Sequence, residues 1–264
     1  MGGLSLGPLV LSAERAPVLA AILVALLVAG LLARRVGAEL NAWLLSVLVM
    51  AALLGRITFV ALNWSGFAGA PWTILAFWQG GFDGWGAAVG GLLASLWHLR
   101  RRQPLWLPAL ATVACAATAW NLVDQLARSG NIDLPATILL TRLDGSHASS
   151  SDWSDGPAVI NLWASWCPPC RREMPMMAEV AARETEVPIL FVNQGEGAEV
   201  IRRYLAQEGI AISALQDPGM QMMAHFQAMG LPATLFIGRD GKLRAGHMGE
   251  ISRARLLSGI EDLR

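Results

Sequence analysis

The chain divides into two halves that differ in how apolar and polar residues follow one another. Four long apolar runs fill most of the first half: Pro17–Leu32, Leu40–Leu62, Gly84–Leu99 and Leu105–Val123. Each run approaches or reaches the roughly 20 residues that a helix needs to cross the hydrocarbon core of a bilayer. Three glycines within the third run favour close helix packing. We therefore expect residues 1–128 to form an α-helical membrane domain with about four transmembrane helices.

Charged residues in this half are few and unevenly placed. Arg34 and Arg35 follow the first run and residues 100–102 are arginines after the third, whereas the loop of about Asn63–Gly81 has no charged residue. Loops rich in arginine face the cytoplasm. The first run lacks a basic segment before it and a small-residue cleavage site after it, so we interpret it as a retained anchor; a cleaved signal peptide is the alternative. The pattern predicts a multi-pass protein of the inner (cytoplasmic) membrane, embedded in lipid, with everything after Val123 in the periplasm.

The second half, residues 129–264, has the composition of a soluble domain. Strands are expected at Ala136–Thr141, Ala158–Trp163, Val187–Asn193, Ile210–Leu215, Ala233–Gly238 and Lys242–His247, and helices at Pro169–Glu184, Glu199–Glu208, Met220–Ala228 and Ile251–Leu263. The unbroken apolar run at Ala158–Trp163 suits a central strand. Alternating strands and helices followed by a hairpin predict an α/β domain with a mixed central sheet flanked by helices.

A Cys-x-x-Cys pair lies between the predicted central strand and the next helix. Cys167 falls at the N-terminus of that helix, where unpaired N–H groups and the helix dipole favour a thiolate, and Pro168 and Pro169 suit the first turn. An exposed thiolate at Cys167, with Cys170 one turn further on, is what dithiol–disulfide exchange requires. A zinc site would need further Cys or His ligands, and neither Cys115 nor the four histidines have such a spacing. We expect a redox-active disulfide and neither a metal nor another cofactor.

Four motifs make this assignment more specific: LWASWCPPC at residues 162–170, EMP at 173–175, GLPAT at 230–234 and RDGK at 239–242. Together they resemble the thioredoxin-like family, and within it the TlpA/ResA-like membrane-anchored thiol–disulfide reductases. The resemblance covers residues 131–264. It implies a thioredoxin-like fold and a protein-disulfide reductase.

The resemblance also implies a substrate-binding loop. Pro232 matches the family's cis-proline, which lies against the dithiol and leaves the preceding backbone free to pair with a bound peptide. Leu231, which precedes Pro232, and Trp166, which precedes Cys167, are then expected to contact the substrate as well.

Glu173 matches the active-site glutamate of ResA-like proteins, a general acid/base for Cys170. The alternative is a glutamate on a solvated helix face. Asn161 stands where many thioredoxins carry a buried aspartate, and because an amide cannot titrate, proton transfer would have to come from Glu173, water or the substrate.

The family further implies partners. These are protein substrates with disulfides, and a membrane electron donor of the DsbD/CcdA type that returns the cysteine pair to the dithiol. Cytochrome c maturation, assembly of an oxidase and general periplasmic repair all fit, and an oxidising or isomerising direction stays open because Cys-Pro-Pro-Cys alone does not fix a potential. No basic tract suggests nucleic acid.

The membrane half resembles part of prolipoprotein diacylglyceryl transferase, through WQGGFDGWG at residues 78–86, two glycines at 90–91 and the arginines at 100–102. Trp85 replaces the histidine of that family's Phe-His-Gly-Gly signature, so we expect an anchor; a transferase-like enzyme with an accessory redox domain is the alternative. A transmembrane electron carrier would need a cysteine pair among the spans, and Cys115 is alone and expected to be buried. A peroxiredoxin would need Thr or Ser three residues before its cysteine, where this chain has Ala164.

Overall fold

The computed structural model describes residues 4–6, 9–11, 16–68, 71–100, 102–128, 133–135, 138–149 and 156–264. They form two compact units, one of residues 15–129 and one that holds residues 130–264 together with a short hairpin. That antiparallel hairpin, β1 (Leu4–Leu6) and β2 (Leu9–Leu11), was not predicted from the sequence.

The first unit contains four long helices at the places that the apolar runs predict: α1 (Ala16–Val36), α2 (Glu39–Leu62), α4 (Gly84–Leu99) and α5 (Trp106–Arg128). In the described part of the chain, α1, α2 and α5 are long and apolar enough to span a membrane. Helix α4 has 16 residues. At 1.5 Å per residue it reaches about 24 Å, less than the ~30 Å hydrocarbon core. The third of the four expected spans is therefore a helix of less than spanning length.

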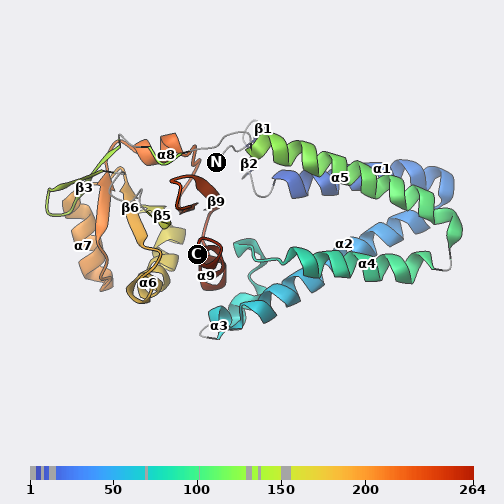
Figure 1. Ribbon diagram of the computed structural model, residues 1–264, viewed down its shortest axis with the longest axis horizontal. Helices are drawn as coiled ribbons and strands as arrows, with labels where there is room; N and C mark the ends of the chain where they lie inside the picture. Colours follow the sequence, from blue (N-terminus) through green and yellow to red (C-terminus); the bar gives the residue numbers. More distant parts are fainter. Residues whose placement is uncertain are drawn as a thin grey trace. The chain divides into compact units, whose positions relative to one another are not determined.

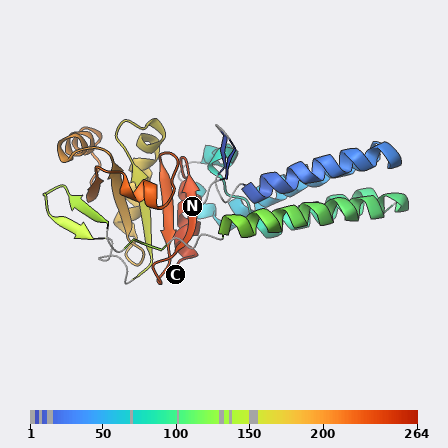
Figure 2. The ribbon, with the colours of Figure 1, turned by 90° about the horizontal axis from the view of Figure 1, so that it is seen from above.

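These helices pack in two pairs, α1 with α5 and α2 with α4 (Figure 1). Figure 2 shows α1 (blue) and α5 (green) running side by side. Glycines let α4 approach α2, because a Cβ at Gly86 would collide with Thr58 and one at Gly90 with the backbone of Met50. The predicted role of these glycines in helix packing is confirmed. Cys115 is exposed on α5 in the described structure, so the prediction that it is buried is wrong.

The segment between α2 and α4 folds around Arg56. It contains α3 (Trp64–Phe67) and the 3-10 turns η1 (Pro71–Leu75) and η2 (Phe77–Gln79). The buried Arg56 guanidinium donates hydrogen bonds of 2.7–3.0 Å to the carbonyls of Thr73, Ile74, Gly80 and Gly81. The arginine that interrupts the second apolar run thus holds the uncharged loop in a defined fold.

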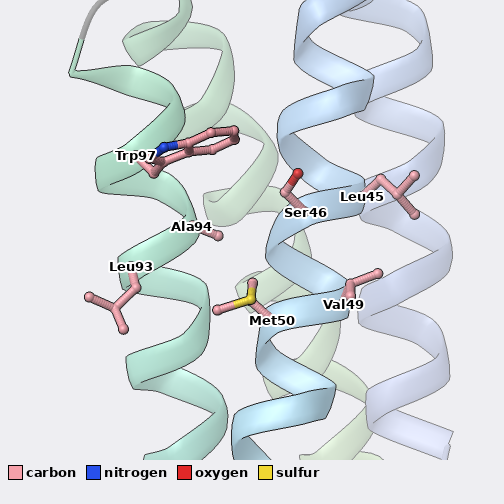
Figure 3. A pocket seen from close by; sticks show the side chains of 7 residues that line it. All are labelled: Leu45, Ser46, Val49, Met50, Leu93, Ala94 and Trp97. Carbon is pink, nitrogen blue, oxygen red and sulfur yellow. The ribbon is translucent and has the colours of Figure 1, made fainter.

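An apolar groove lies between α2 and α4, with a volume of about 580 Å³ (Figure 3). It is lined by Leu45, Ser46, Val49, Met50, Leu93, Ala94 and Trp97. Ser46 is the one hydroxyl in this lining, and its Oγ lies 2.9 Å from Nε2 of His98.

The second unit is built on a seven-stranded sheet with the order β4-β3-β7-β6-β5-β8-β9. The strands are β3 (Leu139–Arg142), β4 (His147–Ser149), β5 (Ala158–Trp163), β6 (Ile189–Gln194), β7 (Ala214–Asp217), β8 (Ala233–Ile237) and β9 (Leu243–Met248). Strands β5, β6 and β7 are parallel neighbours and the other pairs are antiparallel. The predicted mixed central sheet is confirmed, with β5 fully buried inside it.

Helices cover both faces of this sheet: α6 (Pro168–Arg183), α7 (Ala198–Glu208), α8 (Gln221–His225) and α9 (Arg253–Glu261). Alternate residues of a strand point to opposite faces. Val159 and Trp163 of β5 accordingly pack in the apolar cluster that contains side chains of α6, α7 and α9, whereas Ile160 and Leu162 pack in the cluster that contains α8.

Strand limits were predicted less well than the presence of the strands. The strand expected at Ala136–Thr141 begins at Leu139, and residues 136–137 lie outside the described part of the chain. Strand β4 was not predicted. The strand expected at Ile210–Leu215 starts only at Ala214, because Ile210 follows the left-handed Gly209 that ends α7 and packs in the helix-side core.

Candidate active site

The two cysteines of the Cys-x-x-Cys motif form a disulfide at the start of α6, with a Cα–Cα distance of 5.3 Å. Cys167 is the N-cap residue of this helix, and the N–H of Cys170 donates to its Sγ at 3.3 Å. Pro168 and Pro169 occupy the first turn, where a missing N–H costs no intrahelical bond. When the disulfide opens, the helix N-terminus favours the Cys167 thiolate.

Exposure differs from the prediction at this point. Cys167 is 2% exposed and Cys170 is fully buried, because both pack in the cluster that also contains Trp163 and Ala164. The prediction of a surface thiol at Cys167 is wrong for the disulfide form. The neighbouring Trp166 is instead 67% exposed.

A carboxylate fixes the loop between β5 and α6. Glu196 accepts hydrogen bonds from the Ser165 N–H at 2.7 Å and from the Ser165 hydroxyl at 2.5 Å, and the Asn193 side-chain amide donates to it at 2.7 Å. Sequence reasoning missed Glu196. The signal was available in principle, because it follows β6, whose carboxyl end lies beside that of the parallel strand β5.

Glu173 lies on α6 and is 2% exposed, so the alternative of a solvated helix glutamate is wrong. Its Oε1 accepts from the Asn161 side-chain amide and its Oε2 from the N–H of Ile251, both at 2.9 Å. Burial raises the pKa of this carboxyl to about 8, against the opposing effects of these two hydrogen bonds. A glutamate with such a pKa can hold and release a proton near neutral pH.

Asn161 is fully buried beside this carboxyl. Its Nδ2 also lies 3.3 Å from the hydroxyl of Thr234 on the neighbouring strand β8, and its Oδ1 has no hydrogen-bond partner. Because the two ends of an amide are interchangeable in such a network, a reversed Asn161 would place Oδ1 where it accepts a hydrogen bond from the O–H of neutral Glu173.

The loop before β8 contains a cis peptide bond between Leu231 and Pro232, as the motif predicted. Ala233 pairs with Leu162 in the β5–β8 ladder. This loop and the end of β5 that leads to the cysteines therefore lie at the same end of the sheet. Leu231 packs against the core, and the Pro232 carbonyl accepts from the N–H of Gly249 at 2.9 Å. The predicted site residues are thus gathered at one end of the sheet. Among the described residues, no group of three or more His, Cys, Asp or Glu suits a metal ion.

Comparison with known proteins divides the chain in the same place. Residues 132–246 match the AhpC/TSA family. Relatives include the thiol-disulfide oxidoreductase ResA of Halalkalibacterium halodurans, 28% identical over 158 residues that cover 56% of this chain and 89% of that protein, and ResA of Geobacillus kaustophilus, 27% identical with 48% and 74% covered. The second unit is a thioredoxin-like domain whose sequence is similar to the AhpC/TSA family. These relatives confirm the predicted enzyme class, a thiol–disulfide oxidoreductase.

Solved structures similar to the chain include MTB dsbF, with 25% identity, a TM-score of 0.46 and 50% of this chain and 99% of that chain covered. A putative thiol:disulfide interchange protein DsbE from Chlorobium tepidum has 25% identity and a TM-score of 0.46, with 50% and 96% covered.

The helical unit is similar to a different family. Residues 6–132 match the prolipoprotein diacylglyceryl transferase model, which agrees with the resemblance found in the sequence. Trp85, in the place of the signature histidine, is 83% exposed in the first turn of α4.

Proposed function

We propose that the chain is a membrane-tethered reductase of protein disulfides in the periplasm. The observation that carries this proposal is the redox pair at the N-terminus of α6 with a buried, protonatable glutamate on the same helix. Helices α1, α2 and α5 supply the tether.

In the first step the Cys167 thiolate attacks one sulfur of a substrate disulfide. A mixed disulfide between Cys167 and the substrate forms, and the substrate's other sulfur leaves as a thiolate that takes a proton. The N-cap position of Cys167 and the N–H of Cys170 support this role. Trp166, Leu231 and Pro232 bind the substrate chain beside the cysteines.

In the second step Cys170 attacks Sγ of Cys167. Glu173 takes the proton of the Cys170 thiol, the second substrate sulfur leaves as a thiolate that takes a proton from water, and the Cys167–Cys170 disulfide forms. Two electrons have then passed to the substrate. A carboxyl with a pKa of about 8 suits this transfer, because it lies close to that of an ordinary thiol.

The cycle closes when a membrane dithiol donor of the DsbD/CcdA type reduces the pair again. The arginine-rich ends of the apolar runs support the orientation that this requires, with residues 129–264 on the periplasmic side. We propose that residues 1–128 anchor the domain in the lipid and dock this donor.

The redox state of the cysteine pair in living cells tests the direction. Trapping with an alkylating reagent should find Cys167 and Cys170 mostly as the dithiol. A pair that is mostly disulfide would show an oxidase and contradict the proposal.

The match to the transferase family is the reason to consider a second activity. We propose that the helical unit has none, because the indole of Trp85 has a donor N–H and no basic nitrogen with which to accept a proton.

A further inference from the structure

His247 is linked to Glu173 through a single peptide group. The carbonyl of Glu250 lies 3.2 Å from Nε2 of His247, and the N–H of Ile251 donates to Oε2 of Glu173 at 2.9 Å. That carbonyl and that N–H belong to the same peptide bond. Because a carbonyl oxygen only accepts, Nε2 of His247 is the protonated ring nitrogen. The chain of donors runs from the imidazole to the peptide and from the peptide to the carboxylate.

The sheet register brings His247 to this place. Asn161 pairs with Thr234 in the β5–β8 ladder, and Thr234 pairs with His247 in the β8–β9 ladder. Directly opposed residues of neighbouring strands point to the same face. Asn161 contacts Glu173, so the three side chains form a polar row on the face that α6 covers. His247 is 4% exposed, which makes it a buried part of the site.

A second contact from α6 holds the residue that supplies this carbonyl, through its side chain. The Glu250 carboxylate accepts from Nε of Arg172 at 2.8 Å. Adjacent residues of α6 therefore bind adjacent residues of the segment after β9: Arg172 binds Glu250, and Glu173 binds Ile251. The Arg172–Glu250 pair lies at the exposed edge, whereas the His247 contact lies inside.

We propose that His247 is a positioning residue for thiol–disulfide exchange: through the peptide group of Glu250 and Ile251 it orients and polarises the N–H that stabilises the Glu173 carboxylate. The inference rests on the proposed role of Glu173 in the exchange. Hydrogen bonds in a chain polarise one another, so a donor on the carbonyl strengthens the N–H on the other side of the peptide. His247 thereby eases ionisation of Glu173 without touching the reacting sulfurs.

The charged groups around Glu173 are few and come from defined elements. Arg172 is its neighbour on α6 and favours the carboxylate, and the Glu250 side chain opposes it from the segment after β9. Strands β5 and β8 contribute the neutral side chains of Asn161 and Thr234. Against this background, removal of the His247 donor should raise the pKa of Glu173 further.

The test compares His247→Leu, which removes the donor, with His247→Gln, which keeps a donor near the Nε2 position without a titratable ring. His225→Leu is the matched control, because Nε2 of His225 also contacts a backbone carbonyl, that of Asp133, at an exposed site on α8. Each full-length chain, reduced and in detergent, carries ¹³C at the glutamate δ carbon, and the Glu173 resonance is the one that Glu173→Gln removes. A model disulfide gives the pH dependence of exchange for the same samples.

We expect His247→Leu to raise the pKa of Glu173 by about one unit and to slow exchange at neutral pH by up to about tenfold, since one unit is a tenfold change in the ionised fraction. His247→Gln and His225→Leu should leave both unchanged. An unmoved Glu173 titration in folded His247→Leu overturns the inference, as does a shift of the same size in His247→Gln. Should His247→Leu not fold, His247→Asn replaces it, because its shorter donor does not reach the Glu250 carbonyl.

The two proposals fail separately. If the wild-type chain does not reduce the model disulfide, the proposed function is wrong whatever the titration shows. If the wild type reduces it and the pKa of Glu173 is the same in His247→Leu as in the wild type, the positioning role alone is wrong.

Discussion

Replacing Glu173 by glutamine should change how the stability of the thioredoxin-like domain depends on pH. In the folded chain burial raises the pKa of Glu173 from 4.5 to about 8. Between these two pH values the native state keeps the Glu173 proton, whereas the unfolded state has lost it. The stabilising contribution of neutral Glu173 is therefore complete below pH 4.5 and is lost as the pH rises through about 8.

The size of the effect follows from the difference between the pKa of Glu173 in the unfolded and in the folded state. One pKa unit corresponds to 1.36 kcal/mol, so the wild type should lose about 4 kcal/mol of unfolding free energy between pH 5 and pH 9 through this group. Glutamine has no proton to lose. The difference in unfolding free energy between Glu173→Gln and wild type should therefore shift by about 4 kcal/mol in favour of the variant over this range.

Denaturant unfolding of the oxidised full-length chain in detergent, followed by near-ultraviolet circular dichroism, measures this difference. Glu199→Gln is the control, because Glu199 is an exposed helix glutamate with only surface ion pairs on α7, and its curve should stay parallel to that of the wild type. A Glu173→Gln curve parallel to the wild type would refute the reasoning, since Glu173 would then be ionised or hydrated in the folded state.

Three further predictions concern the tether, the helical unit and the loop before the cysteines. Cysteines placed at Gly3 and Ser258 should react with a membrane-impermeant maleimide in intact spheroplasts and one at Gln103 should not; protection of Ser258 would contradict the periplasmic orientation. The intact chain should not complement a strain that lacks diacylglyceryl transferase, because Trp85 offers no base, and complementation would establish a second activity. Glu196→Gln should slow exchange severalfold while the fold is kept, since the amide can accept from only one of the two Ser165 donors. Loss of that hydrogen bond removes about 1–2 kcal/mol of the free energy that holds the loop in place. An unchanged rate against a model disulfide would show that the loop needs no such support.

The patterns that predicted this molecule best were those that depend on local sequence. The limits of β5 and α6 follow from an unbroken apolar run and from two prolines in a first helical turn, and both were read within one residue. Apolar runs likewise located four helices. That all four cross the membrane was the weaker inference, because α4 has 16 residues.

Contacts between distant residues were beyond the sequence. The burial of Glu173 depends on the N–H of Ile251, 78 residues further along the chain, and no local pattern distinguishes it from an exposed helix glutamate. The same is true of His247, which a strand register brings into the polar row. The exposure of Cys167 was misjudged because it depends on packing around the disulfide.

The most direct test of the central claim is to trap the exchange half-way. Cys170→Ser leaves Cys167 able to attack but removes the thiol that resolves the mixed disulfide, so cells that express it should accumulate covalent complexes on a non-reducing gel after alkylation, and Cys167→Ser should accumulate none. Complexes that form with Cys167→Ser and not with Cys170→Ser would reverse the roles of the two thiols. The absence of complexes from both variants would contradict thiol–disulfide exchange through this pair.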